Sequence, residues 1–167
     1  MEKRQPMGIE LVKRGIVTES DIEKALDYQK THPNKKIGDI INILGLCDSH
    51  VLINAVGEIL EEKAIYLQEK DIRIDVQEYI ALDLVKQYKA IPFEISSGKI
   101  KVCFADTSNK RSIDVIRLLL LNKGLVMEKY ISFETNIDKI IEALEGTSAG
   151  NIDINADVSG LVDSIIK

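Results

Sequence analysis

The sequence is poor in the residues that build metal sites and disulfide frameworks. It has no tryptophan, only two histidines and only two cysteines. None of these residues stands at the spacing of a metal-binding motif, so we expect no metal site. Cys47 and Cys103 lie among apolar neighbours, which favours buried free thiols over a disulfide.

Long apolar runs are missing as well. Leu118–Leu121 is far shorter than the ~20 apolar residues that cross a bilayer, so we expect no transmembrane helix. The charged start, Met1 to Pro6, is not followed by an apolar core, which predicts a cytoplasmic protein without a signal peptide. The net charge of −5 disfavours binding to DNA or RNA.

Catalytic patterns are also absent. There is no glycine-rich phosphate loop ending in Lys-Ser or Lys-Thr, so ATP hydrolysis cannot reside in these residues. The serines lack a histidine partner, and Asp106, which follows an apolar segment, is more typical of a turn than of a catalytic acid. We therefore expect no catalytic residues and no enzyme activity in this chain.

The first sixty residues contain an internal repeat. A shift of 30 positions superposes residues of matching type. The matching pairs are Gly8 and Gly38, Leu11 and Ile41, Gly15 and Gly45, Ile22 and Leu52, Ala25 and Ala55, and Leu26 and Val56.

Each copy of the repeat predicts a helix, a turn and a second helix. In copy one, Gly15 suits a left-handed helix end, and Thr18 with Asp21 forms a capping-box pattern. In copy two, Gly45 ends the first helix and Asp48 or Ser49 caps the second. The expected helices span 8–14, 19–30, 37–44 and 49–59, and each second helix carries an apolar stripe.

The second half changes to a mixed pattern. We expect a short strand at 64–67, helices at 75–80 and 83–88, a β-hairpin at 89–105, a helix at 112–121, a strand at 125–131 and a helix at 134–144. The predicted fold class is therefore α+β, with a tandem helical-hairpin subdomain at 1–62 and a small α/β sheet subdomain at 63–145. A linker at 146–157 and the start of a helix at 158–167 are expected to lead to a further domain.

Two interpretations of the repeat stay open. Paired hairpins can stack only to bury their apolar stripes. Alternatively, Gly8 and Gly38 lie near helix starts, where a missing side chain lets a ligand approach and backbone N–H groups attract phosphate. Two such starts would suit a ligand with two phosphates and twofold symmetry.

The repeat resembles a known tandem motif. Copy one reads Gly8-x-x-Leu11-x-x-x-Gly15, six residues, then Ile22-x-x-Ala25-Leu26-x-x-Gln29, and copy two follows the same order from Lys36-Ile37-Gly38. This pattern is similar to that of MshEN domains, found at the N-termini of pilus and type II secretion assembly ATPases of the PilB, MshE and GspE kind. Tyr88 to Pro92 and Val102 to Asp106 also resemble this family.

The resemblance implies a ligand and a set of binding residues. In the family the two motif copies together bind cyclic di-GMP. The residues that the resemblance assigns to such a site are Arg4, Met7, Gly8, Leu11, Ile22, Leu26, Gln29, Lys36, Ile37, Gly38, Asp39, Ile41, Leu52, Val56 and Asp106. Pro6 and Lys36 stand where the family has arginine, and Ile59 where it has the second glutamine.

The resemblance also implies partners. A regulatory domain of this kind would be joined to an ATPase core that holds ATP and Mg²⁺ and forms the hexamer, on the cytoplasmic face of the membrane. The expected function is regulation through cyclic di-GMP. The alternatives are a nucleotide-independent module that docks on the pilus or secretion platform protein, and a free-standing adaptor. We expect the fragment itself to be monomeric or weakly associated.

Overall fold

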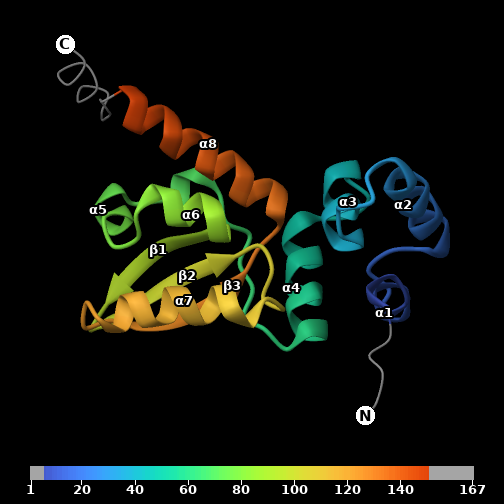
Figure 1. The fold of residues 1–167 in the computed structure, drawn as a ribbon. Helices are drawn as coiled ribbons and strands as arrows, with labels where there is room; N and C mark the ends of the chain where they lie inside the picture. The colour runs from blue at the N-terminus through green and yellow to red at the C-terminus, as the bar shows by residue number, and fades with distance from the viewer. Residues whose placement is uncertain (1–5, 151–167) are drawn as a thin grey trace.

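The repeat forms four helices in the computed structural model, which describes residues 6–150 (Figure 1). They are α1 (Met7–Lys13), α2 (Glu19–Thr31), α3 (Ile37–Leu44) and α4 (Ser49–Leu60). The starts of α1 and α3, and those of α2 and α4, are separated by the same offset as the sequence repeat. The predicted pair of helical hairpins is therefore confirmed.

Local capping explains where these helices begin and end. The Thr18 hydroxyl accepts from the Asp21 N–H at 3.1 Å, and the Asp21 carboxylate accepts from the Thr18 N–H at 3.0 Å. Asp48 caps α4 through the N–H groups that follow it. After α1 and α3, Gly15 and Gly45 have φ of 74° and 66°, a conformation that glycine adopts without a Cβ clash.

The second half forms a small mixed sheet with helices around it. Its elements are the 3-10 helix Glu69–Asp71, α5 (Ile74–Gln77), α6 (Leu82–Tyr88), β1 (Ala90–Ser96), β2 (Lys99–Phe104), α7 (Lys110–Leu121), β3 (Val126–Ile131) and α8 (Glu134–Gly150). The strand order is β1-β2-β3, with β1 antiparallel and β3 parallel to β2. In Figure 1, α6 and α8 run above the sheet and α7 runs below it. The predicted α+β class is confirmed.

Three predicted elements differ from the structure. Residues 64–67 do not form the expected strand and make only an isolated bridge, between Ala64 and Ile131. The Leu67 N–H donates to the Ser132 hydroxyl, so it is not available for a ladder of backbone hydrogen bonds. The helix expected from residue 75 is the short α5, since Asp75 pairs with Arg73 at 2.9 Å and does not cap it. Finally, α8 continues to Gly150, into the segment predicted as linker, whereas residues 151–167 lie outside the described part.

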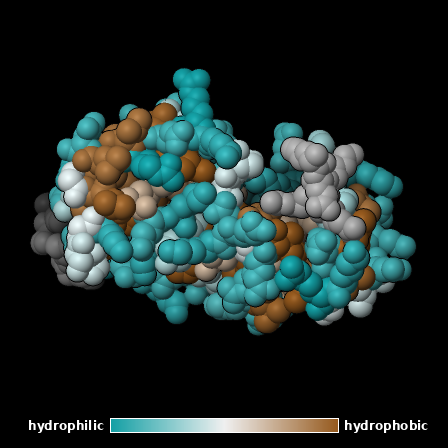
Figure 2. All heavy atoms as spheres, turned by 90° about the horizontal axis from the view of Figure 1, so that it is seen from below, coloured by the Kyte–Doolittle hydropathy of each residue, from teal (hydrophilic) through white to brown (hydrophobic). Residues whose placement is uncertain are grey.

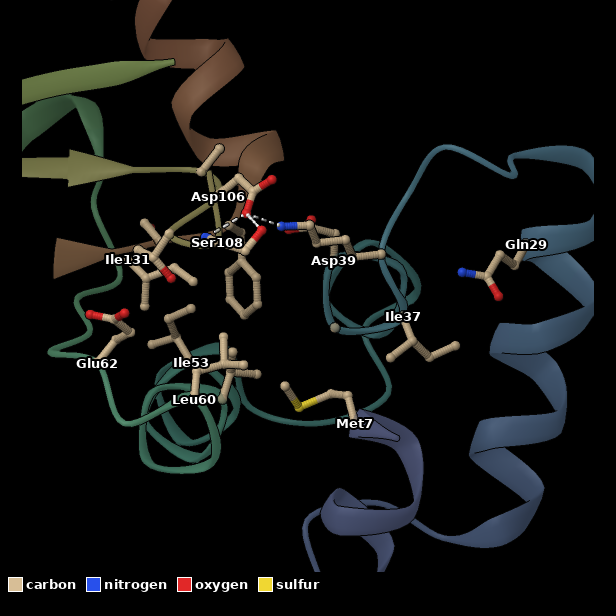
Figure 3. Close-up of a pocket in the computed structure, with 17 residues that line it drawn as sticks. Met7, Gln29, Ile37, Asp39, Ile53, Leu60, Glu62, Asp106, Ser108 and Ile131 are labelled. Carbon is tan, nitrogen blue, oxygen red and sulfur yellow. Dashed lines mark hydrogen bonds and ion pairs between the residues drawn. The ribbon is translucent and has the colours of Figure 1, made fainter. Parts of the chain in front are cut away.

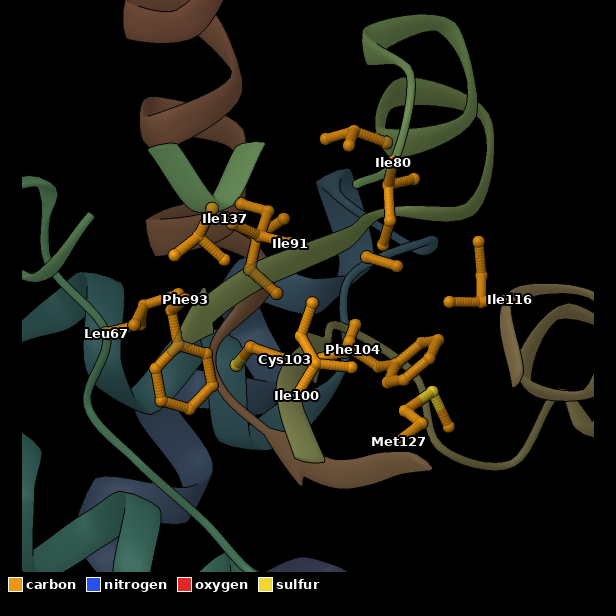
Figure 4. Packing of buried hydrophobic residues seen from close by; sticks show 14 of the residues in the cluster. Leu67, Ile80, Ile91, Phe93, Ile100, Cys103, Phe104, Ile116, Met127 and Ile137 are labelled. Atoms are coloured by element: carbon orange, nitrogen blue, oxygen red, sulfur yellow. The ribbon is translucent and has the colours of Figure 1, made fainter. Parts of the chain in front are cut away.

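The apolar side chains form two clusters. The larger fills the sheet subdomain, where Phe104, Ile116 and Met127 pack between β2, α7 and β3 (Figure 4). The smaller joins the repeat helices through residues such as Leu11 and Ile41, and it also includes Phe133, the residue just before α8. Phe133 thus ties the two halves together. No helix among residues 6–150 is long and apolar enough to cross a membrane.

Gly57 of α4 sets how closely the repeat approaches the sheet subdomain. A Cβ at this position would lie 2.7 Å from the Ala64 Cβ and 2.8 Å from the Glu62 carbonyl oxygen. We expect Gly57→Val to lower the free energy of unfolding by about 1–3 kcal/mol, because the backbone of 62–64 must move away. Urea denaturation measures this change.

A matched control is Gly38→Ala in α3. Its Cβ would meet only the Val56 Cγ2, at an ordinary contact distance of 3.5 Å, so we expect no loss of stability. Equal stability of wild type and Gly57→Val would mean that this close approach is not required.

Candidate functional site

A cavity of about 590 Å³ lies where the repeat meets the sheet subdomain (Figure 3). Residues from α1, α2, α3 and α4 form one side, and the loops that follow β2 and β3 form the other. Its lining consists of Met7, Gln29, Lys36, Ile37, Gly38, Asp39, Ile53, Val56, Leu60, Glu62, Ala105, Asp106, Thr107, Ser108, Ile131, Ser132 and Phe133.

The structure brings together some of the residues assigned from the sequence and separates others. Those that line the cavity are Met7, Gln29, Lys36, Ile37, Gly38, Asp39, Val56 and Asp106. Leu11, Ile41 and Leu52 are fully buried in the repeat core, and Gly8 and Ile22 line a separate depression. Leu26, which was expected on the apolar stripe of α2, is instead 47% exposed, and Arg4 lies outside the described residues.

The two repeat copies contribute unequally. Met7 and Ile37, which are equivalent in the repeat, both line the cavity. Gln29 also lines it, with its side-chain amide donating to the Lys35 carbonyl at 2.9 Å. Its equivalent, Ile59, belongs to the apolar core. The cavity is therefore built around copy two, with Met7 and Gln29 added by copy one.

A small polar cluster crosses the cavity. The Lys36 ammonium lies 3.2 Å from the Asp106 carboxylate, which also accepts hydrogen bonds from the Ser108 N–H at 2.9 Å and hydroxyl at 2.6 Å. Partial burial acts to raise the pKa of Asp106, but the Ser108 hydrogen bonds and the charge of Lys36 outweigh it and hold that pKa below its usual value. Asp106 is thus ionised at neutral pH.

Asp39 is the most deeply buried acid of the cavity. Its carboxylate accepts a hydrogen bond of 2.9 Å from the Glu134 N–H at the start of α8. This bond partly compensates the side chain for the loss of water. Burial raises the pKa of Asp39 to about 6, since the hydrogen bond from Glu134 and the charge of Lys36 only partly offset the loss of water. This carboxylate gains a proton just below neutral pH.

The first turn of α3 faces the same cavity and has no side-chain cap. The second helices of the repeat have side-chain caps, whereas α1 and α3 begin after Pro6 and Lys36 without any side-chain cap bond. Ile37 and Gly38, in the first turn of α3, line the cavity. The N–H groups of a first helical turn and the helix dipole favour an anion at this position.

On the side of the cavity made by the sheet subdomain, the sequence pointed only to Asp106 and missed the other lining residues. Ser108, Ser132 and Phe133 follow the carboxyl ends of β2 and β3, which lie side by side because these strands are parallel. In open α/β sheets ligands gather at this edge. The expected order of a strand, a helix and a strand could have pointed to these loops.

The lining suits a partly apolar, partly polar organic ligand. Met7, Val56 and Phe133 offer apolar and aromatic surface, and Lys36 offers a cation. The volume falls within the ~300–1,000 Å³ of common ligand sites. Among the described residues, no cluster of histidine, cysteine or acidic side chains could hold a metal ion.

Comparisons with known proteins give one family and one fold. The family model of the MshEN domain matches residues 63–151, more than half of the chain. A structure described as MshE with cdg has a TM-score of 0.57 at 21% identity, over 84% of this chain and 99% of its own. The N-terminal domain of XpsE has a TM-score of 0.51 at 20% identity, over 85% and 97%. No curated protein sequence matches the chain.

Proposed function

Because this chain belongs to the MshEN domain family, we propose that it is the N-terminal regulatory domain of a pilus or type II secretion assembly ATPase and binds cyclic di-GMP in the cavity. One observation carries the proposal: Met7 and Ile37, which are equivalent in the repeat, line the same cavity. This cavity also holds the Lys36 ammonium, and the helices α1 and α3 begin beside it without side-chain caps. The structure of MshE with cdg, an abbreviation of cyclic di-GMP, has a similar fold and supports this choice of ligand.

Each kind of group in the cavity has a role in this proposal. A phosphate would lie near the Lys36 ammonium and the first-turn N–H groups of α3, which are the donors of positive charge in a lining that also contains Asp39, Glu62 and Asp106. The N–H groups of a guanine edge would donate to the ionised Asp106 or to the Gln29 amide oxygen. Phe133 and Val56 would contact the flat faces of the bases.

Calorimetry of the chain with purified cyclic di-GMP tests the proposal. We expect saturable binding that Lys36→Ala weakens by about tenfold to a hundredfold, as for the loss of one charged hydrogen bond. The matched control is Lys70→Ala, an exposed lysine of the 3-10 helix outside the cavity lining, which should bind as the wild type does. The absence of both heat and thermal stabilisation at millimolar ligand would overturn the proposal.

In the assembled machine, we propose that the ligand would bias an attached ATPase core. The core would hold ATP and Mg²⁺ and form the hexamer, on the cytoplasmic face of the membrane. Cyclic di-GMP would act only if it binds one arrangement of the two halves more tightly than another. The contacts Lys36–Asp106 and Asp39–Glu134 join these halves at the cavity, which supports such coupling.

A second candidate function is docking on the platform protein without a nucleotide. Several large apolar side chains are exposed on the described surface, among them Ile9, Leu26 and Leu118. Figure 2 shows apolar atoms reaching the surface at both ends of the molecule. Pull-down of the platform component by the chain, unchanged by cyclic di-GMP and by Lys36→Ala, would favour this function.

A further inference from the structure

The internal repeat gives each surface of copy one a counterpart in copy two. The face of copy two that carries Gly38, Asp39, Ile53 and Val56 is buried against the sheet subdomain and the cavity. Its counterpart in copy one consists of Gly8, Ile9, Glu23 and Leu26 and is called here the outer face. The same backbone arrangement therefore exists twice, once covered and once open.

The outer face exposes two large apolar side chains, Ile9 and Leu26. Terminal units of stacked repeats normally carry a polar outer surface that keeps them soluble. Here Ile9 is 48% and Leu26 47% exposed. Together with Val12 and Ile22, Ile9 borders a depression of about 400 Å³ between α1 and α2. Ile9 and Leu26 thus leave apolar area exposed to water on a terminal unit, where polar residues are usual.

The covered copy indicates what such a face binds. The segment that covers this face of copy two consists of Phe133 and the first residue of α8 and is called here the occupant. Phe133 is 2% exposed and belongs to the apolar cluster of the repeat. The N–H of the next residue, Glu134, donates to the Asp39 carboxylate. The occupant is thus an aromatic residue followed directly by the first turn of a helix. The depression beside the outer face is lined by two acidic residues, Glu19 and Glu23, and one lysine, Lys13, so its charge is on balance negative and favours the positive end of a helix.

We propose that the outer face of copy one is a docking site for another protein that presents an aromatic residue immediately before a helix start. Ile9 occupies the position of Asp39, so the outer face binds mainly through apolar contact. Leu26 and Ile9 are its anchors. This site is separate from the cavity and does not require a nucleotide.

A peptide with the sequence of residues 130–144 reproduces the occupant of copy two and serves as the probe. We expect it, when added to the isotope-labelled full chain, to shift the NMR amide signals of α1 and α2, including Gly8 and Ile9. A peptide with Phe133→Ala should bind about tenfold more weakly or worse, and protein with Leu26→Ser should lose affinity to a similar extent. Leu118→Ser, which alters an apolar side chain of α7 that is 61% exposed, should leave binding unchanged.

The proposal is overturned by any of three results: no amide shifts at millimolar peptide, equal binding of the Phe133→Ala peptide, or equal binding to Leu26→Ser protein. Because the probe contains no nucleotide, each of these results leaves the cyclic di-GMP proposal untouched. Circular dichroism of Leu26→Ser checks that the repeat remains folded, which its exposed position leads us to expect.

Discussion

Asp39→Asn should make the protein more stable at pH 8, by about 1–3 kcal/mol. The side chain is 6% exposed, and burial raises its pKa from the ordinary 3.8 to about 6. At ~1.4 kcal/mol per pH unit, keeping Asp39 ionised in the fold costs up to about 3 kcal/mol. Asparagine carries no charge, and its amide oxygen can still accept the hydrogen bond from the Glu134 N–H.

The pH dependence of this difference has a defined sign. A carboxyl with a raised pKa binds its proton more tightly in the folded than in the unfolded protein. It therefore contributes most to stability at low pH, below about 3.8, and that contribution is lost as the pH rises through about 6. The advantage of Asp39→Asn should be present at pH 8 and small at pH 4.

Urea denaturation at the two pH values measures this effect. The exposed Asp27→Asn in α2 is the matched control, and it should change stability by less than ~0.5 kcal/mol at either pH. If Asp39→Asn instead destabilised the protein equally at both pH values, the hydrogen bond to Glu134 would outweigh the burial of the charge. A buried acid that costs stability and lines a cavity is typical of a functional position.

Phe104→Ala should lower the free energy of unfolding by about 3–5 kcal/mol. Phe104 is fully buried at the end of β2 and pairs in register with Ile131 of β3. Removing its ring leaves a void among Ile116, Met127 and their neighbours that the packed sheet cannot close. Because the Phe104 carbonyl accepts from the Ser132 N–H at 3.2 Å, the cavity wall should loosen as well.

Guanidinium denaturation tests this prediction, with Leu118→Ala in α7 as the comparison. Leu118 is 61% exposed, so its truncation should cost less than ~0.5 kcal/mol. A loss below ~1.5 kcal/mol for Phe104→Ala would mean that the sheet subdomain repacks around the missing ring.

The repeat could be predicted closely because its determinants are local. Thr18 with Asp21, and the glycines at 15 and 45, fix helix boundaries through neighbours a few residues away. Residues 64–67 were predicted as a strand on their apolar pattern, but distant side chains decide their conformation. The Leu67 N–H donates to the Ser132 hydroxyl, and the Leu67 carbonyl oxygen accepts from the Asn136 side chain. No local sequence pattern predicts contacts between residues so far apart in the chain.

The same limit applies to the candidate site. The motif located the repeat side of the cavity, including Lys36, Gly38 and Asp39. It did not separate residues that face the cavity from Leu11 and Ile41, which face the core, because both kinds recur at the same offset. Which helix face is buried depends on the sheet subdomain, which covers copy two and leaves Leu26 of copy one exposed.

The proposal that the cavity at the junction binds cyclic di-GMP is tested by an NMR titration of the isotope-labelled chain with that dinucleotide. We expect the amide signals of Gly38, Ser108 and Phe133 to move along one common binding curve, because these residues from both halves line the same cavity. Signals that stay still at millimolar ligand, or that move only at residues remote from the cavity such as Leu118, would contradict it.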